Sequence, residues 1–213
     1  MVDFFLNHLQ LFQDEFTFDS ISEYTEYLKV NNMRSFNGEP VKSKGELMIA
    51  NFLFRNNVNY DYEAKYPHPT GSGTRRKYQP DFTVIAPTED GERKVYIEFW
   101  GVNREYRTAK FINVERYLND MNWKCEVHEK NDTKLIQLFH YEFQEGTLEE
   151  RLKAELERHG IPLNPISDRE ILARMKESGK ISNLAGLIKP ILSGYRSNDY
   201  TIENLYAKSA ERF

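Results

Sequence analysis

Residues 78–101 read YQPDFTVIAPTEDGERKVYIEFWG, and this stretch decides the fold class of the chain. Two apolar runs rich in β-branched and aromatic residues flank the turn signal Glu89-Asp90-Gly91, which predicts a β-hairpin. Asp81 opens the first strand, and Glu98 lies near the end of the second, 17 residues later. Because a hairpin sets matching strand ends side by side, we expect these two side chains within about 5 Å of one another.

Outward from the hairpin, the hydrophobic period alternates between helical and strand-like stretches. In order along the chain we expect a helix at 19–30, a helix at 43–54, strands at 58–66, 81–86 and 94–99, a helix at 109–123, a strand at 134–138, and helices at 147–158, 167–177, 181–193 and 200–211. The core order α-β-β-β-α-β favours an α/β fold with a mixed central sheet flanked by helices. We therefore expect a helical N-terminal extension at 1–36, a core at 37–144 and a helical C-terminal appendage at 145–213.

Composition excludes several classes of protein. With 39% hydrophobic and 29% charged residues, the chain of 213 residues is too apolar for general disorder. Its single cysteine, Cys125, excludes an intramolecular disulfide and a multi-cysteine zinc site. The sequence shows neither a signal-peptide pattern nor a run of roughly 20 apolar residues, so we expect a cytoplasmic protein that does not enter a membrane.

Charge is unevenly distributed. The formal net charge is −4, but the segment 65–77 carries basic residues and no acid. The candidate nucleic-acid-binding residues are Arg75, Arg76, Lys77, Arg107 and Lys110. Beside Tyr66 and Tyr78 they would grip a phosphate backbone while an aromatic ring stacks on a base. Basic runs of this kind are also typical of an ordinary solvated surface.

A third carboxylate, Glu46, lies in the first turns of the helix expected at 43–54, and that helix can lean its acid toward the sheet end that carries Asp81 and Glu98. Converging carboxylates repel one another, and a hard divalent cation such as Mg²⁺ or Mn²⁺ removes the conflict. Such an ion activates water and orients a phosphodiester. Taken singly, each acid is equally typical of a turn, a cap or a helix N-terminus.

Three runs carry a resemblance to a known superfamily. They are VKSKGELMIANFLFRNNVNYDYEAKY at 41–66, YQPDFTV at 78–84 and VYIEFWG at 95–101. Together they resemble the PD-(D/E)xK nucleases, and most closely the nuclease-like domain within helicase IV and related superfamily-one helicases. The resemblance continues through residues 117–139 and 145–161, spans roughly residues 35–165 and implies a restriction-endonuclease-like core. It also implies metal binding by Asp81 and Glu98, assisted by Glu46; in the mechanism that we favour, the Phe99 carbonyl completes the metal ligands.

One departure from the superfamily pattern concerns its lysine, which normally follows the strand Glu by two residues. Here Trp100 occupies that position. Lys124 is our candidate for a migrated catalytic lysine, and Lys110, expected to begin the same helix, is the alternative. Lys124 would otherwise be a cation at a helix C-terminus, complementing the dipole.

Other residues in the sequence do not meet the requirements of a zinc site, a phosphate-binding loop or a nucleophilic cysteine. His128 and His140 have no spaced partner or nearby cysteine pair, so a zinc site is not expected. Gly71-Ser72-Gly73 is not followed by the residues of a phosphate-binding loop, which leaves this chain without an ATPase motif. Cys125 is expected near the buried face of its helix and is not a candidate nucleophile.

Three hypotheses remain. The leading one is a Mg²⁺- or Mn²⁺-dependent deoxyribonuclease module of a helicase-like repair or defence protein. Its partner would be DNA, with RNA as an open alternative, and a helicase motor would lie in the same or a partner chain. The second is a catalytically inactive nuclease-fold module that binds DNA for a superfamily-one helicase. The third is an interaction protein whose tail at 181–211 exposes the apolar stripe Leu184, Leu187, Ile191 and Leu205.

Overall fold

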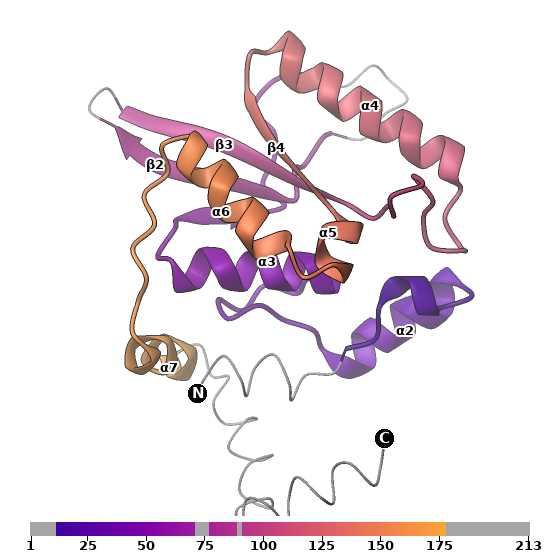
Figure 1. The fold of residues 1–213 in the computed structure, drawn as a ribbon, viewed down its shortest axis with the longest axis horizontal. Coiled ribbons are helices and arrows are strands. Elements are labelled where there is room, and N and C mark those ends of the chain that lie inside the picture. The colour runs from indigo at the N-terminus through magenta and orange to yellow at the C-terminus, as the bar shows by residue number, and fades with distance from the viewer. Residues whose placement is uncertain (1–11, 71–76, 89–90, 178–213) are drawn as a thin grey trace, which may run out of the picture. The chain divides into compact units, whose positions relative to one another are not determined.

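A computed structural model describes residues 12–70, 77–88 and 91–177 (Figure 1). The chain divides into two compact units, Met1–Asp168 and Arg169–Phe213. The elements in chain order are η1 (Glu15–Thr17), α2 (Ile21–Asn31), α3 (Lys44–Arg55), β1 (Tyr60–Tyr62), β2 (Phe82–Thr88), β3 (Gly91–Trp100), α4 (Val114–Lys130), β4 (Lys134–Phe139), α5 (His140–Gln144), α6 (Leu148–Arg158) and α7 (Asp168–Glu177). The helices expected at 181–193 and 200–211, with their apolar stripe, lie outside the described residues.

The centre of the first unit is a four-stranded mixed sheet in the order β1-β2-β3-β4. Strands β1, β2 and β3 are antiparallel neighbours, and β4 runs parallel to β3. The β2–β3 ladder ends where Phe82 faces Ile97, so Asp81 and Glu98 both lie just past its last pair. The predicted hairpin and the predicted mixed α/β class are confirmed.

Helices cover both faces of this sheet, with α3 and α6 on one side and α4 on the other (Figure 1). Side chains of β3 alternate between the two faces. Val95, Ile97 and Phe99 belong to the main core with α3 and α6, whereas Tyr96 packs with Val127 of α4. By the same alternation Glu98 faces α4, which decides the partners available to its carboxylate.

Side-chain caps fix where three of the helices begin. Ser20, Ser43 and Asn113 each accept a hydrogen bond from the backbone N–H three residues later, at the N-termini of α2, α3 and α4. The cap at Ser43 holds Glu46 in the first turn of α3, where the sequence placed it. None of the helices in the described part of the chain is long and apolar enough to cross a bilayer.

Two expected elements have different bounds. The helix expected at 109–123 is Val114–Lys130, because Asn113 provides the cap, and Val114 at its first position is 38% exposed. The strand expected at 58–66 is limited to Tyr60–Tyr62, and Glu63, with a φ of 49°, turns the chain out of the extended conformation.

The expected C-terminal appendage at 145–213 begins with a helix that belongs to the first compact unit. Leu148, Leu152 and Leu156 of α6 are fully buried in the main core, where α6 packs against α3 and β4. These leucines recur every four residues on one helix face, so the helix buries an apolar stripe against the sheet.

Candidate metal centre

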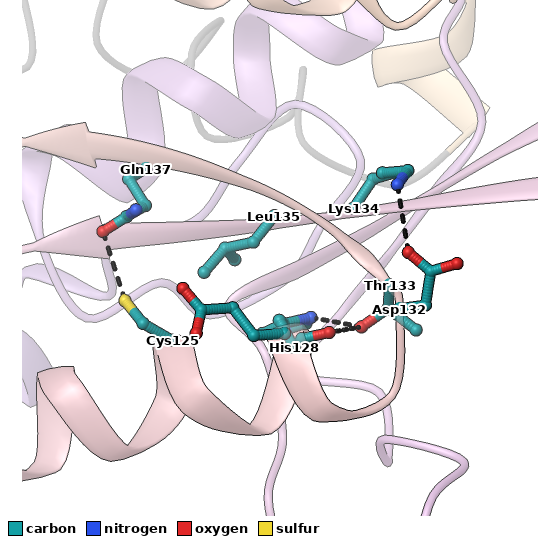
Figure 2. A pocket seen from close by; sticks show the side chains of 8 residues that line it. Cys125, His128, Asp132, Thr133, Lys134, Leu135 and Gln137 are labelled. Atoms are coloured by element: carbon teal, nitrogen blue, oxygen red, sulfur yellow. Dashed lines mark hydrogen bonds and ion pairs between the residues drawn. The ribbon is translucent and has the colours of Figure 1, made fainter.

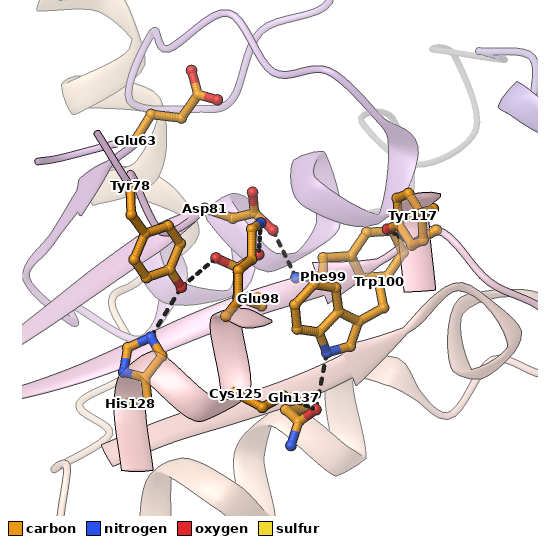
Figure 3. A network of polar contacts seen from close by, with 12 residues as sticks. Glu63, Tyr78, Asp81, Glu98, Phe99, Trp100, Tyr117, Cys125, His128 and Gln137 are labelled. Atoms are coloured by element: carbon orange, nitrogen blue, oxygen red, sulfur yellow. Dashed lines mark hydrogen bonds and ion pairs between the residues drawn. The ribbon is translucent and has the colours of Figure 1, made fainter. Parts of the chain in front are cut away.

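Glu98 is a carboxylate held at the end of β3 with only 1% of its residue surface exposed. One oxygen, Oε1, accepts a hydrogen bond of 2.6 Å from the Tyr78 hydroxyl, and the other, Oε2, lies 2.5 Å from the ammonium group of Lys124. Figure 3 shows the carboxylate between β3 and α4, beside Asp81. Burial, followed by the nearby Asp81 charge, raises the pKa of Glu98 to about 8.

Asp81 immediately precedes β2 and is tied to the neighbouring strand. Its Oδ2 accepts a hydrogen bond of 2.7 Å from the Phe99 backbone N–H. In a strand, the N–H and C=O of one residue leave the same edge, so the Phe99 carbonyl also faces the edge occupied by Asp81. Burial is the main cause that raises the pKa of Asp81. The end of the ladder therefore gathers three oxygen-bearing groups: Asp81, Glu98 and the Phe99 carbonyl.

Glu46 reaches this sheet end from α3. Its Oε2 accepts hydrogen bonds from the Tyr62 hydroxyl at 2.6 Å and from the Lys42 backbone N–H at 2.9 Å. Burial, and then the charge of Asp81, raises the pKa of Glu46 to about 8. The preceding residue, Gly45, allows this approach, because a Cβ there would overlap the ring of Phe99.

Lys124 supplies the cation of the cluster. Lys124 lies within α4, which ends at Lys130, so the expectation that Lys124 ends a helix is wrong. The dipole at the C-terminus of the helix therefore does not explain a lysine at this position. Its ammonium group is also 5.1 Å from the ring centroid of Trp100, the residue two positions after Glu98. Burial alone would lower the pKa of Lys124, but the carboxylates of Glu98 and Asp81 outweigh it and raise the pKa.

A buried chain of hydrogen bonds supports Glu98 from behind. The Tyr78 hydroxyl also lies 2.9 Å from His128 Nε2, and His128 Nδ1 lies 2.7 Å from the Thr133 hydroxyl. With Glu98 ionised, Tyr78 donates to it, so His128 Nε2 donates to Tyr78 and Nδ1 accepts from Thr133. Burial lowers the pKa of His128 to about 4, which keeps the ring neutral.

The same buried hydrogen-bond network explains why the two tyrosines predicted to stack on a base cannot do so. Tyr66 is 7% exposed and its hydroxyl lies 2.7 Å from that of Thr133, while Tyr78 is 4% exposed. The expectation that these rings stack on a base is wrong, because both are packed beneath α4. The role of His128 was not predicted from the sequence, although His128 follows Lys124 by one helical turn and so shares its face.

The expected basic surface is only partly visible. Arg75 and Arg76 lie outside the described residues, and Lys77 and Arg107 are exposed. Lys110 pairs with Asp19 at 2.6 Å on the surface and lies before α4, so the expectation that it begins that helix is wrong. The structure thus brings together Glu46, Asp81, Glu98 and Lys124, and leaves Lys110 apart.

A pocket of about 310 Å³ adjoins the far end of the hydrogen-bond chain, between α4 and β4 (Figure 2). Cys125 and His128 line it, and Cys125 Sγ lies 3.4 Å from Gln137 Oε1. Burial raises the pKa of the Cys125 thiol, which disfavours the reactive thiolate. The raised pKa leaves the Cys125 thiol poorly activated for nucleophilic attack.

A more compact cluster lies outside the predicted site. Among the described residues, Asp14, Glu15 and His140 are the group whose potential ligand atoms all lie within 4.8 Å of one another. The carboxylates of Glu46, Asp81 and Glu98 are more widely spaced than that. Sequence reasoning set His140 aside because its partners lie more than a hundred residues away along the chain. A second pocket, of about 190 Å³, is lined by both Glu15 and Glu46.

The chain matches no protein-family model, no curated protein and no solved structure. The case for its function therefore rests on the residues and the geometry described above.

Proposed function

We propose that this chain is a Mg²⁺- or Mn²⁺-dependent nuclease module that hydrolyses phosphodiester bonds in DNA. The observation that carries the proposal is the contact between Lys124 and Glu98 beside Asp81. It supports a catalytic lysine that reaches the acids from α4 instead of from β3. The order α3-β1-β2-β3-α4-β4 supports a restriction-endonuclease-like core of the PD-(D/E)xK type.

The donor set fits a hard divalent cation. Asp81, Glu98 and the Phe99 carbonyl offer only oxygen, the atom that Mg²⁺ and Mn²⁺ prefer. Burial makes ionisation of the acids unfavourable, since the pKa values of Glu46 and Glu98 are raised to about 8, and a cation would relieve that cost. Glu46, whose Oε2 is held by the Tyr62 hydroxyl and the Lys42 N–H, would act through a water molecule.

The ion, when bound, supplies Lewis-acid polarisation of the phosphodiester and lowers the pKa of a water molecule. The protein's own groups do the rest. Asp81 is held by the Phe99 N–H, and Glu98 is held by Tyr78, so both oxygen donors are fixed in place before substrate arrives. Lys124 places a positive charge where negative charge develops on the phosphate. Glu46 orients the attacking water and accepts its proton.

DNA is the favoured substrate because the superfamily that the sequence resembles acts on it, with RNA as the alternative. Exposed Lys77 and Arg107 flank the site in sequence and would neutralise backbone phosphates. By the same resemblance, the module would act beside a helicase motor in the same or a partner chain.

The test is cleavage of labelled single-stranded DNA, duplex DNA and RNA with Mg²⁺ or Mn²⁺, with EDTA as the metal-free arm. Asp81→Asn keeps the size of the side chain and should abolish cutting. Asp61→Asn is a matched control, because Asp61 is exposed on β1 of the same sheet and contributes nothing to the cluster. Cleavage retained in Asp81→Asn would sink the assignment.

A second candidate is a DNA-binding module that has lost catalysis. Lys124 already neutralises Glu98 directly, and an ammonium group in that position can take the place of a metal ion. In that case the chain binds DNA equally well with EDTA and with Mg²⁺, and no metal tried produces cleavage. Binding measured by fluorescence anisotropy beside the cleavage assay separates the two functions.

A further inference from the structure

A histidine and two acids meet at a second place in the fold. Asp14 and Glu15 lie at the start of η1, and His140 begins α5, directly after β4. His140 Nε2 lies 2.9 Å and 3.0 Å from the two oxygens of Asp14 and 3.8 Å from Glu15 Oε1. One imidazole nitrogen thus faces two carboxylates from a distant segment.

This cluster is buried and incompletely satisfied. The side chain of His140 is fully buried and that of Glu15 is 9% exposed. Glu15 Oε2 is buried without a hydrogen-bond partner among the described residues. An ionised carboxylate in that state is costly, and burial raises the pKa of Glu15. For Asp14, burial acts in the same direction, but hydrogen bonds from His140 and the Phe16 N–H outweigh it and lower the pKa.

We propose that Asp14, Glu15 and His140 form a second metal site, which binds a first-row transition ion of the Zn²⁺ class. One neutral imidazole and two carboxylates balance a divalent charge, and imidazole favours Zn²⁺ over Mg²⁺. Ligands around a tetrahedral zinc lie roughly 3.3 Å apart, given metal–ligand distances of about 2.0–2.1 Å. His140 Nε2 lies 2.9 Å from Asp14 Oδ1 and 3.8 Å from Glu15 Oε1, and these two separations span that value.

Aromatic rings pack against His140, whose Nδ1 is buried without a hydrogen-bond partner among the described residues. Phe16 stacks on the imidazole with ring centroids 4.2 Å apart, and Phe143 packs at 5.8 Å. A pocket of about 190 Å³ reaches the cluster at Glu15, which is the one of the three proposed ligands that lines it. The same pocket reaches Glu46, so this site adjoins the candidate catalytic centre without sharing a ligand with it.

A bound ion would join the η1 segment to the end of β4. Its first role is structural, since it would hold Asp14 and Glu15 against His140 more firmly than a single hydrogen-bonded pair can. The inference does not depend on nuclease activity, because none of the three ligands belongs to the catalytic cluster.

The experiment is a calorimetric titration of Zn²⁺ into the full chain stripped of metal with EDTA, followed by thermal unfolding with and without Zn²⁺. The decisive variant is Glu15→Gln, which keeps the volume of the side chain and leaves the Asp14–His140 hydrogen bond intact. It should weaken Zn²⁺ binding at this site at least ~10-fold and remove the zinc-dependent rise in melting temperature. Because the substitution also removes a buried charge, the metal-free variant should unfold no more easily than the wild type.

Asp81→Asn separates this site from the catalytic centre. We expect it to retain one Zn²⁺ that is lost in Asp81→Asn/Glu15→Gln, and the His140 ring nitrogen resonances should shift with Zn²⁺ in Asp81→Asn. If Zn²⁺ binds Asp81→Asn and Asp81→Asn/Glu15→Gln equally well, or binds neither, the cluster is a hydrogen-bonded Asp–His pair and the proposal is wrong. Absence of DNA cleavage by the wild-type chain, with Mg²⁺ and with Mn²⁺, would overturn the proposed function and leave this result standing.

Discussion

The ammonium group of Lys124 lies 2.5 Å from Glu98 Oε2, although Lys124 lies in the middle of α4 and Glu98 near the end of β3. The contact forms because Glu98 faces the side of the sheet that α4 covers. Tyr78 holds the other oxygen of the same carboxylate, so a phenol and an ammonium group position Glu98 from two sides.

Lys124→Ala should reduce the rate of metal-dependent cleavage by about 10²–10³-fold, since the positive charge near the developing phosphate charge is lost. Lys110→Ala is the matched control, because Lys110 makes an exposed ion pair with Asp19 and should leave the rate within about twofold. Initial rates at saturating Mg²⁺ measure the effect. Equal losses in both variants would show that Lys124 has no special role.

Stability without metal should fall as the pH rises from 6.5 to 8. The pKa values of Glu46 and Glu98 are about 8 in the folded state and 4.5 ordinarily, so the folded protein holds protons that the unfolded chain has released. Each carboxyl contributes at most about 1.4 kcal/mol per pH unit over this interval. His128, with a pKa of about 4, acts in the opposite direction only below pH 6.5.

The same ionisation should make metal-induced stabilisation grow with pH, because the ligands must lose their protons before an ion binds. Between pH 6.5 and 8, the melting temperature with Mg²⁺ should exceed the melting temperature with EDTA by a difference that grows with pH. In Asp81→Asn the difference should vanish. A metal-free melting temperature that stays constant or rises with pH would contradict the raised pKa values.

Tyr78→Phe should weaken Mg²⁺ binding about 10–100-fold, because it removes the hydroxyl that orients Glu98 while keeping the ring. Tyr66→Phe is the control: Tyr66 is equally buried and packs on the same face, but its hydroxyl contacts Thr133 instead of Glu98. Titration calorimetry with Mg²⁺ compares the two. Similar affinity in both variants would mean that Tyr78 only fills space.

Gly45→Ala should destabilise the fold by roughly 1–3 kcal/mol, the usual cost of overpacking a core, because its Cβ would overlap the ring of Phe99. Displacing α3 should also move Glu46 away from Asp81 and lower activity. Gly101→Ala is the comparison, since a Cβ there would lie 3.5 Å from the Tyr117 hydroxyl, an ordinary contact. Urea unfolding of both variants measures the difference; equal midpoints would show that Phe99 moves aside easily.

What the sequence determined about this protein is local. The turn between two apolar runs was enough to predict the β2–β3 hairpin and to place Asp81 and Glu98 at neighbouring strand ends. Ser43 was enough to predict where α3 begins, and with it the position of Glu46 in the first turn. Turn chemistry, caps and periodicity act over a few residues, so they can be recognised in the sequence alone.

The tertiary structure decided which distant residues meet. Whether Lys124 reaches Glu98 depends on which face of the sheet α4 covers and on a helix start at Val114 that the periodicity placed five residues too early. The approach of Asp14 and Glu15 to His140 depends on η1 packing beside the end of β4. Such contacts form because burial of apolar faces brings whole elements together, and the spacing of polar residues along the chain does not encode that.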